Sequence, residues 1–93
     1  MTHGAFLEYL YANNCDVYKE VDTYYKFRKR GTTGSKNMSG LPKRDLAEEM
    51  RPFTICQVCH NLGIGVPEEV KDVEEVIVYI RDKHLNNENQ NND

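Results

Sequence analysis

The chain has 93 residues, a net charge of −3 and three cysteines. This length limits it to one domain. No apolar run approaches the length of a membrane-spanning helix. An odd number of cysteines does not fit a fold built on disulfide bonds. The first residues do not show the pattern of a signal peptide, so we expect a cytoplasmic protein, or a nuclear one if the source is eukaryotic.

The first helix is predicted over residues 5–12. Phe6 with Leu10, and Leu7 with Tyr11, are pairs four residues apart that share one helical face. Two asparagines follow and break the pattern.

A second helix is predicted over residues 16–30, with Asp16 as its cap. Val17, Val21 and Tyr24 recur at helical spacing, and the last turn is basic, as the helix dipole favours. β-branched and aromatic residues are dense here, so a strand is the alternative interpretation.

Residues 31–40 are rich in Gly, Ser and Thr and predict a flexible loop. Further helices are expected over residues 41–50, with Pro42 in the first turn, and over residues 55–62, with Thr54 as cap and a glycine at the end. A last helix is expected to open at Pro67 and to run to about residue 85.

These elements predict an all-α fold, a small bundle of four or five helices forming a single helical domain over residues 1–85. Residues 86–93 are almost entirely Asn, Asp, Glu and Gln, which predicts a disordered Asn-rich tail.

Positive charge is concentrated in the first half of the chain. Residues 1–44 hold eight Lys and Arg against four Asp and Glu, whereas residues 45–93 hold four against eleven. Such a basic cluster can meet phosphates or an acidic partner, and it can also be a solvated loop that balances the acidic last helix.

Residues 46–62 are similar to the helix-turn-helix pair of many bacterial and phage repressors. Leu46-Ala47 precedes a turn, and Thr54 is followed four residues later by Val58. The resemblance implies that the helix from Thr54 enters the major groove, where Gln and Asn read adenine. The nucleic-acid-binding residues predicted on this basis are Lys26, Arg28, Lys29, Arg30, Lys36, Lys43, Arg44, Gln57 and Asn61. The turn has Arg51-Pro52 where a glycine is usual, so an ordinary pair of packed helices is the alternative.

Cys56-Gln57-Val58-Cys59-His60 is the one stretch with recognisable site chemistry. Over five residues it resembles the haem-attachment motif of c-type cytochromes, in which two thiols bind the vinyl groups and the histidine ligates iron. It is also half of a zinc site, and it loosely resembles the cysteine-rich modules of DnaJ-type chaperones.

Cys56, Cys59 and His60 are therefore candidate metal ligands, with zinc and covalent haem as the possible cofactors. A dithiol redox pair is a third hypothesis and requires Cys56 at a helix N-terminus. The alternative to all three, which we favour, is that no cofactor binds and both cysteines are small core residues.

The chain has six tyrosines, five of them before residue 26. They are a candidate contact surface. The alternative is that their half-buried rings complete the packing of a small hydrophobic core. We expect a non-catalytic regulatory module, since no phosphate-binding glycine loop or nucleophile motif is present. The first hypothesis is a transcription-regulator-like protein that binds nucleic acid, and a homodimer would suit it. A protein–protein interaction or inhibitor module, using the acidic last helix or the Tyr-rich first helices, is the alternative.

Overall fold

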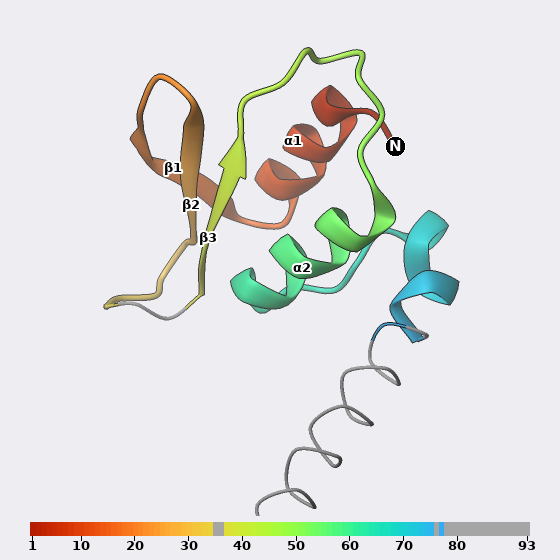
Figure 1. Ribbon diagram of the computed structural model, residues 1–93. Helices are drawn as coiled ribbons and strands as arrows, with labels where there is room; N and C mark the ends of the chain where they lie inside the picture. The colour runs from red at the N-terminus through yellow and green to blue at the C-terminus, as the bar shows by residue number, and fades with distance from the viewer. Residues whose placement is uncertain (35–36, 76, 78–93) are drawn as a thin grey trace, which may run out of the picture.

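The fold in the computed structural model is a three-stranded antiparallel sheet with two helices on one face (Figure 1). The structure describes residues 1–34, 37–75 and 77. The elements are α1 (His3–Ala12), β1 (Cys15–Glu20), β2 (Tyr24–Lys29), β3 (Met38–Pro42), α2 (Pro52–Leu62) and the 3-10 turn η1 (Glu68–Val70). The predicted all-α bundle of four or five helices is therefore wrong.

Local residues account for where both long helices begin and end. The Thr2 side chain accepts a hydrogen bond from the backbone N–H of Ala5 (3.2 Å), which caps α1. Pro52 occupies the first turn of α2, where a missing N–H is harmless. Gly63 ends α2 in the left-handed conformation, at φ 71°.

The helix expected over residues 16–30 is in fact β1, a turn and β2. Along β2, Tyr25, Phe27 and Lys29 alternate with Tyr24, Lys26 and Arg28. β-branched and aromatic side chains fit this pleated geometry, and the strand alternative is the correct one. The sheet order is β1-β2-β3, and a register shift between Val17 and Lys19 bulges β1.

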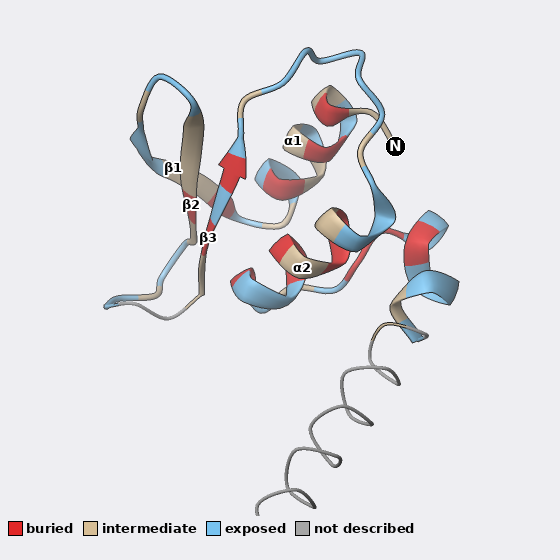
Figure 2. Ribbon diagram, in the orientation of Figure 1, coloured by how far each residue is buried: buried red, intermediate tan, exposed pale blue. Residues whose placement is uncertain are grey.

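One face of the sheet packs against α1 and α2 and forms the core. Along β3 the buried residues Ser39 and Leu41 alternate with exposed or half-buried ones, whereas β1 and β2 each have one buried position, Cys15 and Phe27 (Figure 2). Phe27 is completely buried, and its ring centroid lies 5.9 Å from that of Tyr11 on α1. The core is completed by Phe6, Leu10, Cys15, Leu41, Ile55, Cys56, Val58, Cys59, Leu62, Val66 and Val70.

The helix expected over residues 41–50 is absent, and with it the helix-turn-helix pair. Residues 41 and 42 end β3, where a proline is tolerated because β3 is an edge strand. The segment 43–51 then crosses to α2 as a loop held by the start of α1. The backbone N–H groups of His3 and Gly4 donate to Glu48 O (2.8 Å) and Leu46 O (2.9 Å).

The last predicted helix is confirmed only at its start. Residues 68–70 form η1, and residues 71–75 and 77 are helical. The remainder of that prediction, and the predicted tail over residues 86–93, lie outside the described residues. Within the part of the chain that is described, no helix has the length and apolar character needed to cross a membrane.

Candidate nucleic-acid interface

The face of the sheet that α1 and α2 leave uncovered, here called the outer face, carries a row of aromatic and basic side chains. Tyr24, Lys26 and Arg28 alternate along β2 with the core residues, so all three lie on the outer face. Across β3 they are paired with small or uncharged residues: Tyr24 with Pro42, Lys26 with Gly40, and Arg28 with Met38.

Two tyrosine rings on the outer face have a cation beside them. Lys26 Nζ lies 5.9 Å from the centroid of the Tyr24 ring, and Arg28 Cζ lies 4.6 Å from that of Tyr18. Tyr18 is 40% exposed. A ring next to a cation offers a base a surface for stacking and its phosphate a counter-charge.

Arg28 keeps unused hydrogen-bonding capacity. Its Nη2 donates to Gly34 O (2.9 Å) and lies 3.3 Å from Met38 Sδ, which fixes the guanidinium over the sheet. Its buried Nε has no acceptor among the described residues. Unpaired buried donors are uncommon in folded proteins, and each calls for an explanation.

Positive charge on β1 extends the row. Lys19 lies directly opposite Lys26 in the sheet register, and like charges in that position destabilise a sheet. An anion bound between the two ammonium groups would relieve this repulsion.

Arg30 donates to both carboxylate oxygens of Asp16 (3.0 and 3.1 Å), and this guanidinium holds the pKa of Asp16 below its usual value.

A shallow hollow of about 350 Å³ continues the outer face at the end of β3. Tyr24, Gly40 and Pro42 line it. A Cβ atom at Gly40 would meet nothing within 4 Å, so the surface beside Lys26 is open. A flat, open surface of this kind can accept a planar ring.

The remaining basic residues predicted for nucleic acid are dispersed. Lys29 falls on the helix-covered face, opposite Cys15. Lys43 Nζ pairs with Glu20 Oε2 (3.2 Å) and lies 5.0 Å from the centroid of the Tyr25 ring. Arg44 is exposed in the loop after β3. Lys36 lies outside the described residues.

The polar residues predicted to read bases are used to hold α2 against the sheet. Asn61 Nδ2 donates to Ser39 Oγ on β3 (3.3 Å), and Gln57 Nε2 donates to Asn61 Oδ1 (3.4 Å). Since the first helix of the expected pair is absent, α2 has no partner that would present it to a major groove.

The Cys-x-x-Cys-His stretch lies in α2 with both thiols in the core. Cys56 is the fifth residue of the helix, beyond the first turn that the redox hypothesis requires. Burial raises the pKa of the Cys56 thiol and raises that of Cys59 to about 12. His60 points elsewhere, with its Nε2 3.0 Å from Glu74 Oε2. Among the residues described, no three His, Cys, Asp or Glu side chains stand together as a metal site.

Sequence reasoning missed Lys19 as a member of this surface, and it did not separate Tyr18 and Tyr24 from the other tyrosines. The signal that identifies them is the two-residue alternation on β2, together with the antiparallel register that brings β1 beside it. Comparisons of the chain with protein-family models, with curated proteins and with solved structures find no match.

Proposed function

We propose that this protein binds single-stranded nucleic acid on the outer face of its sheet. The observation that carries the proposal is the row Tyr24, Lys26 and Arg28 on β2, flanked by Tyr18 and Lys19 on β1. Aromatic rings that alternate with cations are the elements by which proteins hold unpaired strands, with bases stacked on rings and phosphates near the charges.

The tyrosines favour a single strand over a duplex. In a duplex each base is stacked between its neighbours, so a side-chain ring on a protein surface has no free base face to contact. In a single strand the bases are free, and each stacked base contributes about 1–3 kcal/mol. The basic residues alone would bind either form, because phosphate contacts carry no sequence information.

The alternative, a protein-interaction module built on the tyrosines, has less support from their environment. Tyr9 Oη donates to Gly65 O (2.5 Å), and the Tyr25 ring lies at the edge of the Phe27 ring in the core (6.1 Å between centroids). These two side chains hold the fold together. On the outer face, by contrast, Tyr18 is exposed and has Arg28 beside its ring, and the half-buried Tyr24 has Lys26 beside its ring.

The test is fluorescence anisotropy with a labelled oligonucleotide, single-stranded or annealed, over a range of salt concentrations. Three cations, Lys19, Lys26 and Arg28, predict a slope of log K against log salt of about −2 for the single strand. Lys26→Gln should make this slope shallower by about 0.7. The matched control is Lys71→Gln, since Lys71 is exposed beside η1 and bonded to Glu68 (3.0 Å).

A second pair of variants separates stacking from charge. Tyr24→Ala should weaken the single-strand complex by about 5- to 150-fold, while Tyr24→Phe keeps the ring and should bind nearly as well as the wild type. Equal slopes for Lys26→Gln and Lys71→Gln would show that the outer face is not the binding surface. Equal affinity for duplex and single strand, unaffected by Tyr24→Ala, would reject the stacking mechanism.

A further inference from the structure

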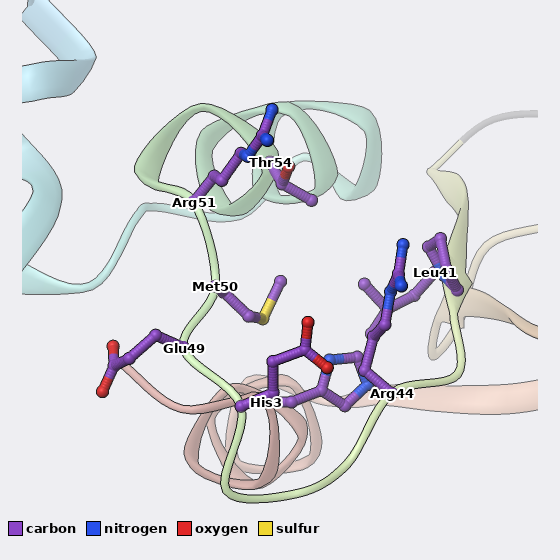
Figure 3. Close-up of a pocket in the computed structure, with 9 residues that line it drawn as sticks. His3, Leu41, Arg44, Glu49, Met50, Arg51 and Thr54 are labelled. Atoms are coloured by element: carbon purple, nitrogen blue, oxygen red, sulfur yellow. The ribbon is translucent and has the colours of Figure 1, made fainter.

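A second concave site shares Leu41 and Pro42 with the hollow beside Tyr24. It is a cavity of about 460 Å³ between the starts of α1 and α2 and the loop 43–51 (Figure 3). This volume is in the range of small-molecule sites. Its lining includes His3, Arg44, Glu48, Met50, Arg51 and Thr54.

His3 lines the cavity and carries a buried, unpaired polar atom. Its side chain is 2% exposed, and its Nε2 makes no hydrogen bond with any described group. Burial lowers the pKa of His3, so the imidazole is neutral at pH 7. A neutral ring nitrogen without a partner costs stability in the empty protein, and a ligand that bonds to it would recover that loss.

The start of α2 adds donors and positive potential. Arg51 is the N-cap and makes no side-chain capping bond, Pro52 has no N–H, and no acidic residue stands in the first turn. The first intrahelical bond is from Ile55 N to Arg51 O (3.2 Å), which leaves the N–H groups of Phe53 and Thr54 for an outside acceptor. Such a terminus is suited to a phosphate group.

Two arginines stand on opposite sides of the cavity, with the Met50 side chain between them (Figure 3). Neither Arg44 nor Arg51 forms an ion pair with a described residue. Glu49 also contributes to the lining but points away from the cavity in Figure 3. Glu48 is the remaining charged residue of the lining, and its carboxylate can accept a hydrogen bond from a ligand N–H.

We propose that this cavity binds a nucleotide with a terminal phosphate. The phosphate sits at the start of α2 between Arg44 and Arg51, and the base lies against Met50 with its polar edge toward His3 and Glu48. The nucleotide is free, or it is the phosphorylated end of a bound strand. The second case rests on the proposed function, and it is geometrically simple because Leu41 and Pro42 line both this cavity and the hollow of the outer face.

The test is calorimetric titration with 5′-AMP, adenosine and inorganic phosphate, with the imidazole C–H signals of His3 followed by NMR. AMP should bind at least tenfold more tightly than adenosine or phosphate alone and should shift the His3 signals. Arg51→Gln should weaken AMP binding about tenfold or more, because a hydrogen bond to a charged group is lost. Arg44 is also exposed, and Arg44→Gln should likewise weaken AMP binding. Lys71→Gln should not change the affinity for AMP.

The two sources of the nucleotide are distinguished with one oligonucleotide carrying either a 5′-phosphate or a 5′-hydroxyl. If the protein prefers the phosphorylated strand by tenfold or more and Arg51→Gln removes this preference, the ligand is the strand end. If it shows no preference but still binds AMP, the ligand is the free nucleotide. Lys26→Gln should weaken strand binding without changing AMP affinity, so failure of the outer-face site leaves this test valid. The inference is overturned if AMP binds no better than phosphate, or if the His3 signals do not move.

Discussion

The thiol of Cys59 connects burial directly to a measurable rate. The side chain is completely buried, and burial raises its pKa from 9.0 to about 12. At pH 8 an unshifted thiol of pKa 9.0 is about one-tenth thiolate, whereas Cys59 is about one part in ten thousand. Because only the thiolate is nucleophilic, Cys59 should react about a thousandfold more slowly in the folded protein than in the unfolded chain.

The assay is labelling with a chromogenic disulfide at pH 8, with and without urea. Cys15 and Cys56 are also buried, and burial raises the pKa of each thiol, so all three should be silent in the native protein and react in urea. Fast labelling of one or two thiols without urea would refute this reasoning. If the label maps to Cys56 or Cys59, that thiol is at the surface, which would favour the zinc, haem or dithiol hypotheses.

The same shift predicts how stability depends on pH. Well below pH 9 the Cys59 thiol is neutral in both states and contributes no pH dependence. Between pH 9 and about 12 the unfolded chain loses this proton while the folded protein keeps it, so the free energy of unfolding falls as pH rises. The slope is at most about 1.4 kcal/mol per pH unit. Urea titrations at pH 8 and 10 should show a larger loss for the wild type than for Cys59→Ala, and an equal loss would contradict the assignment.

Two further predictions concern the fold and are measured by urea unfolding. Phe27→Ala should cost about 3–5 kcal/mol, enough to unfold a domain of this size, whereas Tyr24→Ala on the other face of β2 should cost about 1 kcal/mol or less; similar costs would mean that the two faces are misassigned. Gly63→Ala should cost more than about 1 kcal/mol, because Gly63 has φ +71° and a Cβ there would lie 2.5 Å from Asn37 Nδ2. Gly65→Ala, with nothing within 4 Å, is its control and should be nearly neutral.

The helices could be predicted because local signals and tertiary structure agree in them. α1 begins at His3, two residues before the predicted start, because Thr2 caps it. It ends at Ala12, directly before the two asparagines, as predicted. α2 ends at Gly63 as expected. The predicted start at residue 55 is three residues late, because Pro52 opens α2 instead of lying in a turn before it.

The strands could not be predicted from helical spacing alone. Val17, Val21 and Tyr24 fit a helical face by chance, and in the structure they lie in β1, in the turn and in β2. What decides between helix and strand is long-range pairing, with Tyr25 beside Leu41 and Phe27 beside Ser39. Such contacts are set by tertiary packing, which a short window of sequence does not contain.

The error in fold and the error in site have one physical cause. In a helix, Lys26, Arg28, Lys29 and Arg30 would spread around more than a turn and act as one diffuse basic cluster. In a strand, alternation sends Lys29 to the covered face and aligns Tyr24, Lys26 and Arg28 on the other, while the antiparallel partner adds Lys19. Lys26→Gln and Lys29→Gln, made separately, therefore test both the strand assignment and the binding surface. Only Lys26→Gln should make the dependence of log K on log salt shallower for single-strand binding. A helical cluster would require the two variants to behave alike.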